Sequence, residues 1–384
     1  MEHVTISQQV NKQKKDYFMK ERFKNIEFLR IIGCFAVIFY HLFMKNNGIL
    51  GVGADIEILD KFTQMTRHGN MAVELFFIIS GLFFALNLDT TKSLWEFLKK
   101  KLIRLYPVFI VMLLIGYLGH SLFGLYKFKI YQSILCLFGF NGTILANGIW
   151  WQTGVNAGWY VSTMLWTFLL FYYLLKNYEK KTVDLIIAIL IYCSYGMLIH
   201  YSTGTTWGAN KYFTLFINSG MCRAIGGIGI GYFIAQWYNQ NKETIKNTVL
   251  PIYTKLFLTV IEFMCLFFII NNLLLHKIKY ENNFIFIVVF VLTIMLFLYN
   301  QGFISKFLNK DIFVNLSKYT YSIYMVHCYI IYMLRNYFWN IHKHFLEIHP
   351  IINISIAVFL SILFGVIMYH LVEKPASKYL KKFA

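Results

Sequence analysis

Ten stretches of about 20 mostly apolar residues run through this chain, and they are the main constraint on its fold. About 20 helical residues span the hydrocarbon core of a bilayer. Apolar residues make up 58% of the sequence and charged residues only 14%, whereas soluble domains carry about 25% charged residues. We therefore expect an all-α, polytopic integral membrane protein. The predicted spans are 25–44, 69–88, 102–123, 159–176, 183–201, 218–238, 251–275, 282–299, 316–340 and 353–373, and a shorter apolar piece, 130–146, is expected to be interfacial or re-entrant.

Lysine and arginine are distributed unevenly between these spans. If the N-terminus is cytoplasmic, the inner segments hold 24 of the 36 basic residues, the outer loops hold nine and the spans hold three. The positive-inside rule then predicts that both termini are cytoplasmic. The expected organisation is a basic N-terminal segment (1–24), a transmembrane domain (25–373) and a basic tail (374–384). We expect the first span to be an uncleaved anchor and no soluble domain to follow the last span.

Charge and cysteine content argue against two other classes of protein. The net charge of +18 comes from basic residues that lie between apolar runs and form no continuous patch, so nucleic-acid binding is not expected. The six cysteines occur singly inside apolar segments, without CxxC spacing. We therefore expect small buried hydrophobic residues, with neither a disulfide framework nor a metal site, and no permanently bound cofactor.

Ionisable residues inside the first two spans are the main candidates for chemistry, because each costs a few kcal/mol in a membrane unless it is paired or faces water. Arg30 and His41 lie eleven positions apart, which places them on one helix face about 16 Å apart along the axis. Glu74, near the start of the antiparallel second span, is expected at the same depth as His41. A carboxylate beside an imidazole would fix its tautomer and raise its basicity, so we expect His41 to be a general base oriented by Glu74.

Two further groups of residues stand out. Lys101 and Arg104, one turn apart at the inner end of the third span, form a candidate site for a phosphate group, although cytoplasmic anchoring explains most of that basic cluster. In the ninth span, His327 near mid-membrane and Tyr324 one turn away favour a polar cavity.

Arg223 in the sixth span is a further candidate for the same cavity. The glycines that follow it include a GxxxG pair, Gly227 and Gly231, which predicts a close helix-packing face.

Six motifs follow one another along the chain. They are Arg30-x10-His41, Glu74-Leu75-Phe76-Phe77-x-x-Ser80-Gly81, Lys101-x-x-Arg104-Leu105-Tyr106-Pro107, Trp159-Tyr160-Val161, Tyr321-Ser322-Ile323-Tyr324-Met325-Val326-His327 and Glu373-Lys374-Pro375. Together these motifs resemble the acyltransferase-3 family of bacterial membrane acyltransferases over nearly the whole length. Two departures affect the expected acceptor: Leu165 stands where many members are acidic, and the extracytoplasmic esterase-like domain of some members is missing.

The resemblance implies an acyl donor, usually a coenzyme A thioester reached from the cytoplasm, and an acceptor hydroxyl on a lipid-linked or surface glycan. It also implies that His41 and Arg30 are essential. Trp159 joins Arg223, Tyr324 and His327 as a candidate lining of the polar cavity. We therefore expect a multi-pass protein of the bacterial cytoplasmic membrane that transfers an acyl group, most simply acetyl, directly or through an acyl-enzyme. The alternative is an exporter of polysaccharide or small solutes, which broken helices and ion-coupling carboxylates would favour.

Overall fold

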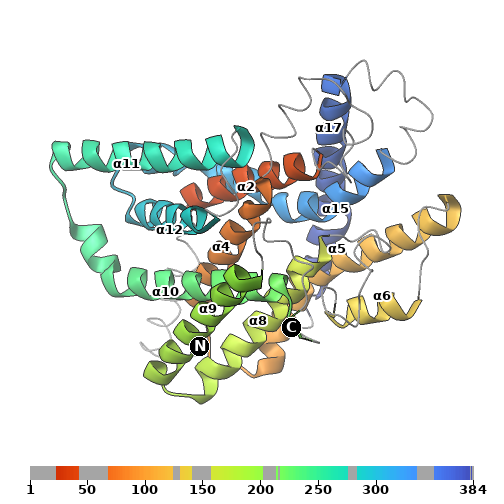
Figure 1. Ribbon diagram of the computed structural model, residues 1–384, viewed down its shortest axis with the longest axis horizontal. Coiled ribbons are helices and arrows are strands. Elements are labelled where there is room, and N and C mark those ends of the chain that lie inside the picture. Colours follow the sequence, from red (N-terminus) through yellow and green to blue (C-terminus); the bar gives the residue numbers. More distant parts are fainter. Residues whose placement is uncertain are drawn as a thin grey trace, which may run out of the picture.

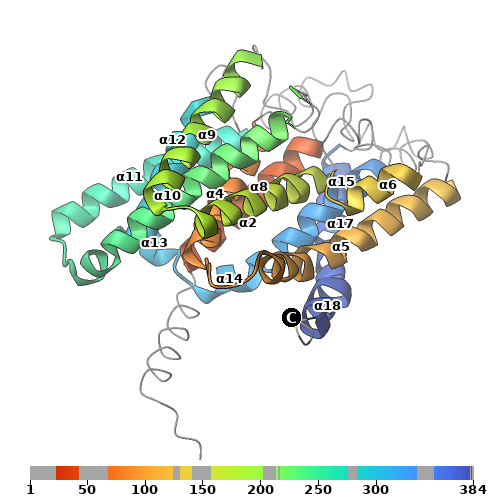
Figure 2. The same ribbon diagram turned by 90° about the horizontal axis from the view of Figure 1, so that it is seen from below.

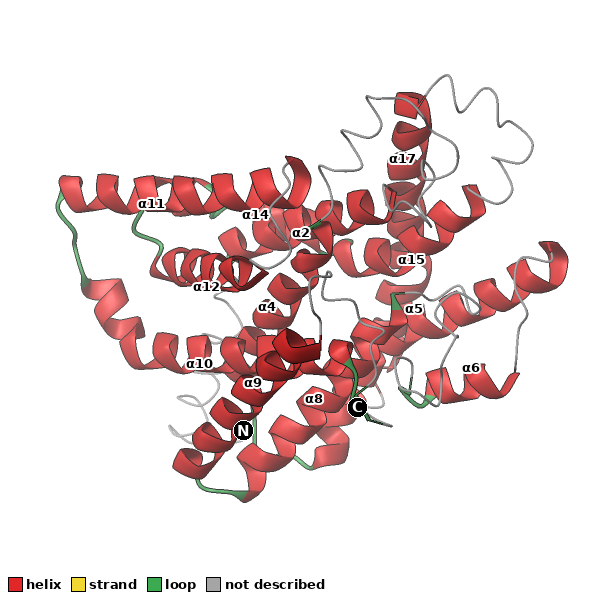
Figure 3. Cartoon of the chain, in the orientation of Figure 1, coloured by secondary structure: helices red, strands yellow, loops and turns green. Residues whose placement is uncertain are grey.

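The computed structural model describes residues 23–42, 68–123, 130–140, 157–201, 213–214, 217–275, 283–334, 350–380 and 382. All the regular elements in these ranges are helices, as Figure 3 shows, so the predicted all-α class is confirmed. The elements are α2 (Lys24–Leu42), η1 (Gly69–Met71), α4 (Ala72–Leu86), α5 (Leu94–Phe123), α6 (Ile130–Leu137), α8 (Gly158–Asn177), α9 (Lys180–Tyr201), α10 (Ser219–Asn247), α11 (Ile252–Ile270), η3 (Asn271–Leu275), α12 (Asn283–Tyr299), α13 (Phe303–Phe307), α14 (Asp311–Ser317), α15 (Thr320–Met333), α17 (Pro350–Met368), η6 (Tyr369–Glu373) and α18 (Lys374–Leu380).

Among the described residues, seven helices are long and apolar enough to cross a membrane, and α12 is a shorter apolar helix. This fits a polytopic membrane protein but does not confirm the predicted count of ten. The two other predicted spans, 218–238 and 316–340, correspond to helices that do not meet this criterion. α10 coincides with span 218–238 but continues to Asn247 in polar sequence, and α15 covers only the first part of span 316–340, whose end lies outside the described residues. Of the predicted piece 130–146, the described part forms α6 and a turn.

The centre of the bundle is formed where α4 packs against α10, with α2 on its other side (Figure 1). Glycines make this approach possible. A Cβ atom on Gly231 would lie 2.1 Å from the carbonyl oxygen of Ile78, and one on Gly81 would lie 2.1 Å from that of Ile228. The packing face predicted from Gly227 and Gly231 is therefore present, and α4 is its partner.

α5 begins eight residues earlier than the predicted span that starts at 102. Its first turn has a capping box, in which the Ser93 amide donates to Glu96 Oε2 (2.7 Å) and the Glu96 amide donates to Ser93 Oγ (3.1 Å). The polar first turns are therefore helical although they are not apolar. As a result, Lys101 and Arg104 lie within the helix, two to three turns from its start.

A buried carboxylate in α11 explains how the short helix α13 begins. Glu262 is fully buried, and its Oε2 accepts hydrogen bonds from the amides of Ile304 and Ser305, both at 3.1 Å. These amides belong to the first turn of α13, where helical N–H groups have no partner within the helix. Glu262 therefore has a structural role as the cap of α13.

Candidate functional site

A cavity of about 1000 Å³ opens at one end of the bundle and is lined by α2, α4, α5, α8, α10, α14, α15, η6 and α18. Figure 2 shows α14, the first turns of α5, and α18 gathered at this end of the molecule. Among the described residues, eight basic side chains line the cavity against two acidic ones, Glu27 and Glu373, so its lining is strongly positive. The basic residues that line it are Arg30, Lys101, Arg104, Lys242, Lys246, Lys318, Lys374 and Lys378.

Three of the four basic residues singled out from the sequence, Arg30, Lys101 and Arg104, line this cavity. The side chain of Arg104 is solvent-exposed, and that of Arg30 lies 3.0 Å from Glu27 Oε2. Lys101 places its Nζ 4.5 Å from the centre of the Phe168 ring, which holds the ammonium group against the wall. The donor-phosphate residues predicted from α5 therefore share one cavity with Arg30 of α2.

Sequence reasoning did not find the other five lysines of the cavity as site residues. It treated them as charges of cytoplasmic segments, and Lys374 also as part of the Glu373-Lys374-Pro375 motif, because they lie in three segments far apart in the chain. Their convergence agrees with the predicted orientation, since all come from segments that the positive-inside rule placed on one side. They are Lys242, Lys246, Lys318, Lys374 and Lys378.

An aromatic layer made of Phe76, Tyr160 and Tyr324 forms part of the lining of the cavity. The ring centroids lie 6.3 Å apart for Phe76–Tyr160, 6.1 Å for Phe76–Tyr324 and 5.5 Å for Tyr160–Tyr324. The Tyr160 hydroxyl is 3.0 Å from Ser80 Oγ, which joins α8 to α4. Beyond this layer, the His327 ring lies 5.5 Å from that of Tyr324. Tyr324 thus lies both in the lining of the basic cavity and next to the ring of His327.

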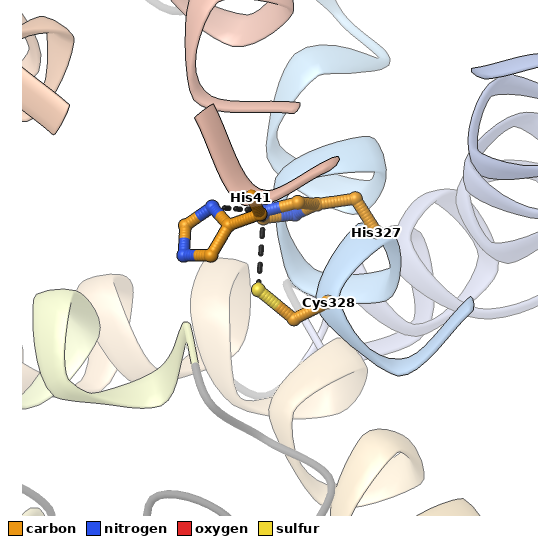
Figure 4. A group of neighbouring side chains, drawn as sticks. All are labelled: His41, His327 and Cys328. Atoms are coloured by element: carbon orange, nitrogen blue, oxygen red, sulfur yellow. Dashed lines mark hydrogen bonds between the residues drawn. The ribbon is translucent and has the colours of Figure 1, made fainter. Parts of the chain in front are cut away.

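His41, in the last turn of α2, faces His327 of α15 (Figure 4). His41 Nδ1 lies 2.9 Å from the carbonyl oxygen of Val37 and 3.3 Å from His327 Nε2. A carbonyl oxygen only accepts, so the proton of the neutral His41 ring resides on Nδ1 and the lone pair on Nε2. In Figure 4 this second nitrogen lies on the side of the ring away from His327. The geometry leaves Nε2 of His41 as a base.

The buried ring of His327 is fixed in the same way. Its Nδ1 lies 2.5 Å from the Tyr324 carbonyl oxygen, so Nδ1 donates and Nε2 carries the lone pair. The Cys328 thiol lies 3.1 Å from that Nε2. His41, His327 and Cys328 together offer three donor atoms that all lie within 4.8 Å of one another.

The predicted juxtaposition of Glu74 and His41 is wrong. Glu74 instead accepts a hydrogen bond of 2.7 Å from Arg223 Nε, in an ion pair whose side chains are 0% and 2% exposed. Equal depth in two helices does not fix the direction of a side chain, and the carboxylate of α4 points toward α10. There a Cβ on Gly227 would lie 3.3 Å from Glu74 Oε2, so the glycine leaves room for the carboxylate.

Arg223 forms this ion pair with Glu74 and has the Trp159 ring beside its guanidinium, whereas Tyr324 lines the basic cavity. Arg223 Nη2 donates to the Asn70 carbonyl oxygen (2.8 Å), and its guanidinium carbon lies 5.6 Å from the centre of the Trp159 ring. The four residues proposed from the sequence as one polar cavity therefore fall into two groups. Tyr324 and His327 lie next to the basic cavity and His41, and Arg223 and Trp159 surround Glu74.

A family model described as an acyltransferase domain matches residues 23–370, almost the whole chain. No curated protein and no solved structure matches the chain. The matched range includes the aromatic layer, both histidines and the lining of the basic cavity as far as Tyr369.

Proposed function

The chain belongs to the acyltransferase-3 family, and on that premise we propose that it transfers an acetyl group from acetyl-coenzyme A to a hydroxyl of a cell-envelope glycan or lipid-linked sugar. We propose the bacterial cytoplasmic membrane as its location. The observation that carries the proposal is the alignment of a basic cavity, an aromatic layer and a histidine base within one bundle.

The donor occupies the basic cavity in this proposal. Coenzyme A carries several phosphate groups, and eight lysine and arginine side chains against two acids form a cavity that attracts them. Arg104 and Lys101 lie one turn apart on α5, and Arg30 joins them from α2. The volume of about 1000 Å³ falls at the upper end of the range of ligand pockets.

The thioester must pass the aromatic layer to reach His41. Phe76 and Tyr324 present ring faces and edges to the flexible acyl-bearing arm, and both line the cavity. A small acyl group passes such a layer with less displacement of the rings than a long one. This supports acetyl as the transferred group.

His41 is the catalytic base in this mechanism. Its Nε2 takes the proton from the acceptor hydroxyl, whose oxygen attacks the thioester carbonyl. The carbon–sulfur bond then breaks, and the thiolate of coenzyme A recovers the proton from His41. The Val37 carbonyl and His327 hold the other side of the ring through Nδ1. They therefore orient the His41 ring, a role that was expected from the sequence for Glu74.

The exporter alternative is less well supported by the described carboxylates. An ion-coupled exporter needs intramembrane acids that are available to bind and release ions. Glu27 contacts Arg30, Glu74 contacts Arg223, and Glu262 accepts from two backbone amides. These acids have structural partners, which favours acyl transfer.

The test is acetyl-coenzyme A turnover by purified protein in lipid nanodiscs, with release of free thiol as the readout. We expect turnover by the wild type, loss of turnover in His41→Ala and a raised donor KM in Arg104→Ala. His200→Ala is the matched control, because His200 lies at the end of α9 with its side chain exposed. Equal turnover by wild type and His41→Ala would refute the assignment of the base, and an unchanged KM in Arg104→Ala would refute the donor site.

A further inference from the structure

We propose that His41, His327 and Cys328 form a Zn²⁺ site, and that Zn²⁺ bound there switches off His41 as a base. The three donors come from two helices, with His41 at the end of α2 and the adjacent pair on α15 (Figure 4). The inhibitory effect rests on the proposed function, whereas the binding of the ion does not.

The spacing of the two imidazoles matches tetrahedral zinc. With Zn–N bonds of about 2.05 Å and tetrahedral angles, two coordinating nitrogens lie about 3.3 Å apart. His41 Nδ1 and His327 Nε2 are 3.3 Å apart. Cys328 Sγ lies 3.1 Å from His327 Nε2, whereas a zinc-bound sulfur would lie about 3.6 Å from it. The three ligand atoms lie within 4.8 Å of one another, so a rotation of the Cys328 side chain away from His327 and toward His41 would complete three ligands around one ion.

The chemistry of these donors favours zinc over the hard cations of the cell. Imidazole nitrogen and thiolate sulfur bind Zn²⁺ well, whereas Mg²⁺ and Ca²⁺ prefer oxygen ligands. His327 already has its lone pair on Nε2, because Nδ1 is held by the Tyr324 carbonyl oxygen. This hydrogen bond on the far nitrogen is the usual arrangement for a zinc-binding histidine. Three protein ligands leave the fourth position for water.

The inhibition follows from the position of the proton on the His41 ring. Binding converts the Cys328 thiol to a thiolate and releases one proton to solvent. His41 must offer the Nδ1 lone pair to the ion, so its ring proton moves from Nδ1 to Nε2 and the hydrogen bond to Val37 is lost. Nε2 then carries a hydrogen and cannot accept the proton of an acceptor hydroxyl. Zinc therefore blocks the base without entering the basic cavity.

Binding is tested on the full-length protein in detergent with a reductant that does not bind metals. Co²⁺ replaces Zn²⁺ as the spectroscopic probe, because a cobalt–thiolate bond gives a charge-transfer absorption band. We expect one equivalent of Co²⁺ to produce this band, and Zn²⁺ to displace it. Cys328→Ser should abolish the band, and Cys265→Ser, which removes a buried cysteine from α11, should retain it. Cys328→Ala, checked by gel filtration, serves if the serine variant does not fold.

Inhibition is tested in the turnover assay with each variant compared to its own rate in the presence of a chelator. Cys328→Ser should raise the Zn²⁺ concentration for half-inhibition at least about 100-fold, because even loss of an outer hydrogen-bond partner of a ligand costs about 10–100-fold. Saturating donor should not relieve the inhibition. A cobalt band that is missing in the wild type or retained in Cys328→Ser would overturn the site. Binding of zinc without slower turnover would overturn the switch, even if the site itself is present.

Discussion

The buried pair of Glu74 and Arg223 gives the sharpest test of the site as the structure describes it. Glu74→Gln keeps the shape of the side chain but leaves the guanidinium of Arg223 as an uncompensated charge, because both side chains are at most 2% exposed. We expect this variant to lose much of its stability. We also expect Arg223→Met to lose a similar amount, since it leaves the carboxylate buried alone.

The magnitude follows from the geometry of the pair. At an effective dielectric constant of about 20, two unit charges about 4 Å apart attract by about 4 kcal/mol. Removing one partner of a buried ion pair costs about 3–5 kcal/mol, so we expect a loss of about 4 kcal/mol for Glu74→Gln. The double variant Glu74→Met/Arg223→Met should recover most of this loss, because it leaves no unpaired charge. Equilibrium unfolding in mixed micelles of increasing SDS content measures all three variants.

Two results would refute this reasoning. Stability unchanged in Glu74→Gln would mean that the ion pair is not formed or that water compensates Arg223. Full stability combined with a fall in turnover would restore the idea that Glu74 orients His41. His41→Gln is the control for turnover, because it removes the base but leaves the pair of Glu74 and Arg223 intact.

Three further predictions concern packing, capping and substrate size. Gly231→Ala should destabilise the bundle by more than about 1 kcal/mol, since the added Cβ would lie 2.1 Å from a carbonyl oxygen of α4. Gly196→Ala, whose Cβ would have no atom within 4 Å, should be neutral or stabilising by up to about 1 kcal/mol. Equal unfolding curves for the two variants would contradict the close contact of Gly231 with α4. Glu262→Ala should cost about 2 kcal/mol in the same assay and make the start of α13 sensitive to proteolysis, because one buried and one half-buried amide lose their acceptor. Resistance to proteolysis like that of the wild type would exclude the cap. Phe76→Ala should raise kcat/KM for butyryl-coenzyme A relative to acetyl-coenzyme A about tenfold, because it opens the aromatic layer. An unchanged ratio of the two kcat/KM values would show that the layer does not select acyl length.

The sequence was sufficient for the fold class and for most of the helix positions. Long apolar runs leave few structures possible in lipid, where backbone groups must be satisfied within the segment, so helices follow directly. The sequence was less informative about helix ends that lie in polar segments, because apolar runs do not mark them. α5 begins in polar sequence through the Ser93–Glu96 capping box, and α10 continues into polar sequence beyond its predicted span.

The sequence also identified individual residues of the site, but only the tertiary structure decided how they combine. Arg30 stood out because charge is rare in a span, and Lys101 and Arg104 stood out as a cationic pair at the inner end of the third span. All three line the basic cavity. Depth along a helix can be estimated from residue number, so His41 and Glu74 were expected at one level. Whether two side chains meet depends also on the rotation of each helix, which packing sets. Gly227 of α10 leaves room for the carboxylate of Glu74, which pairs with Arg223, and α15 brings His327 to His41.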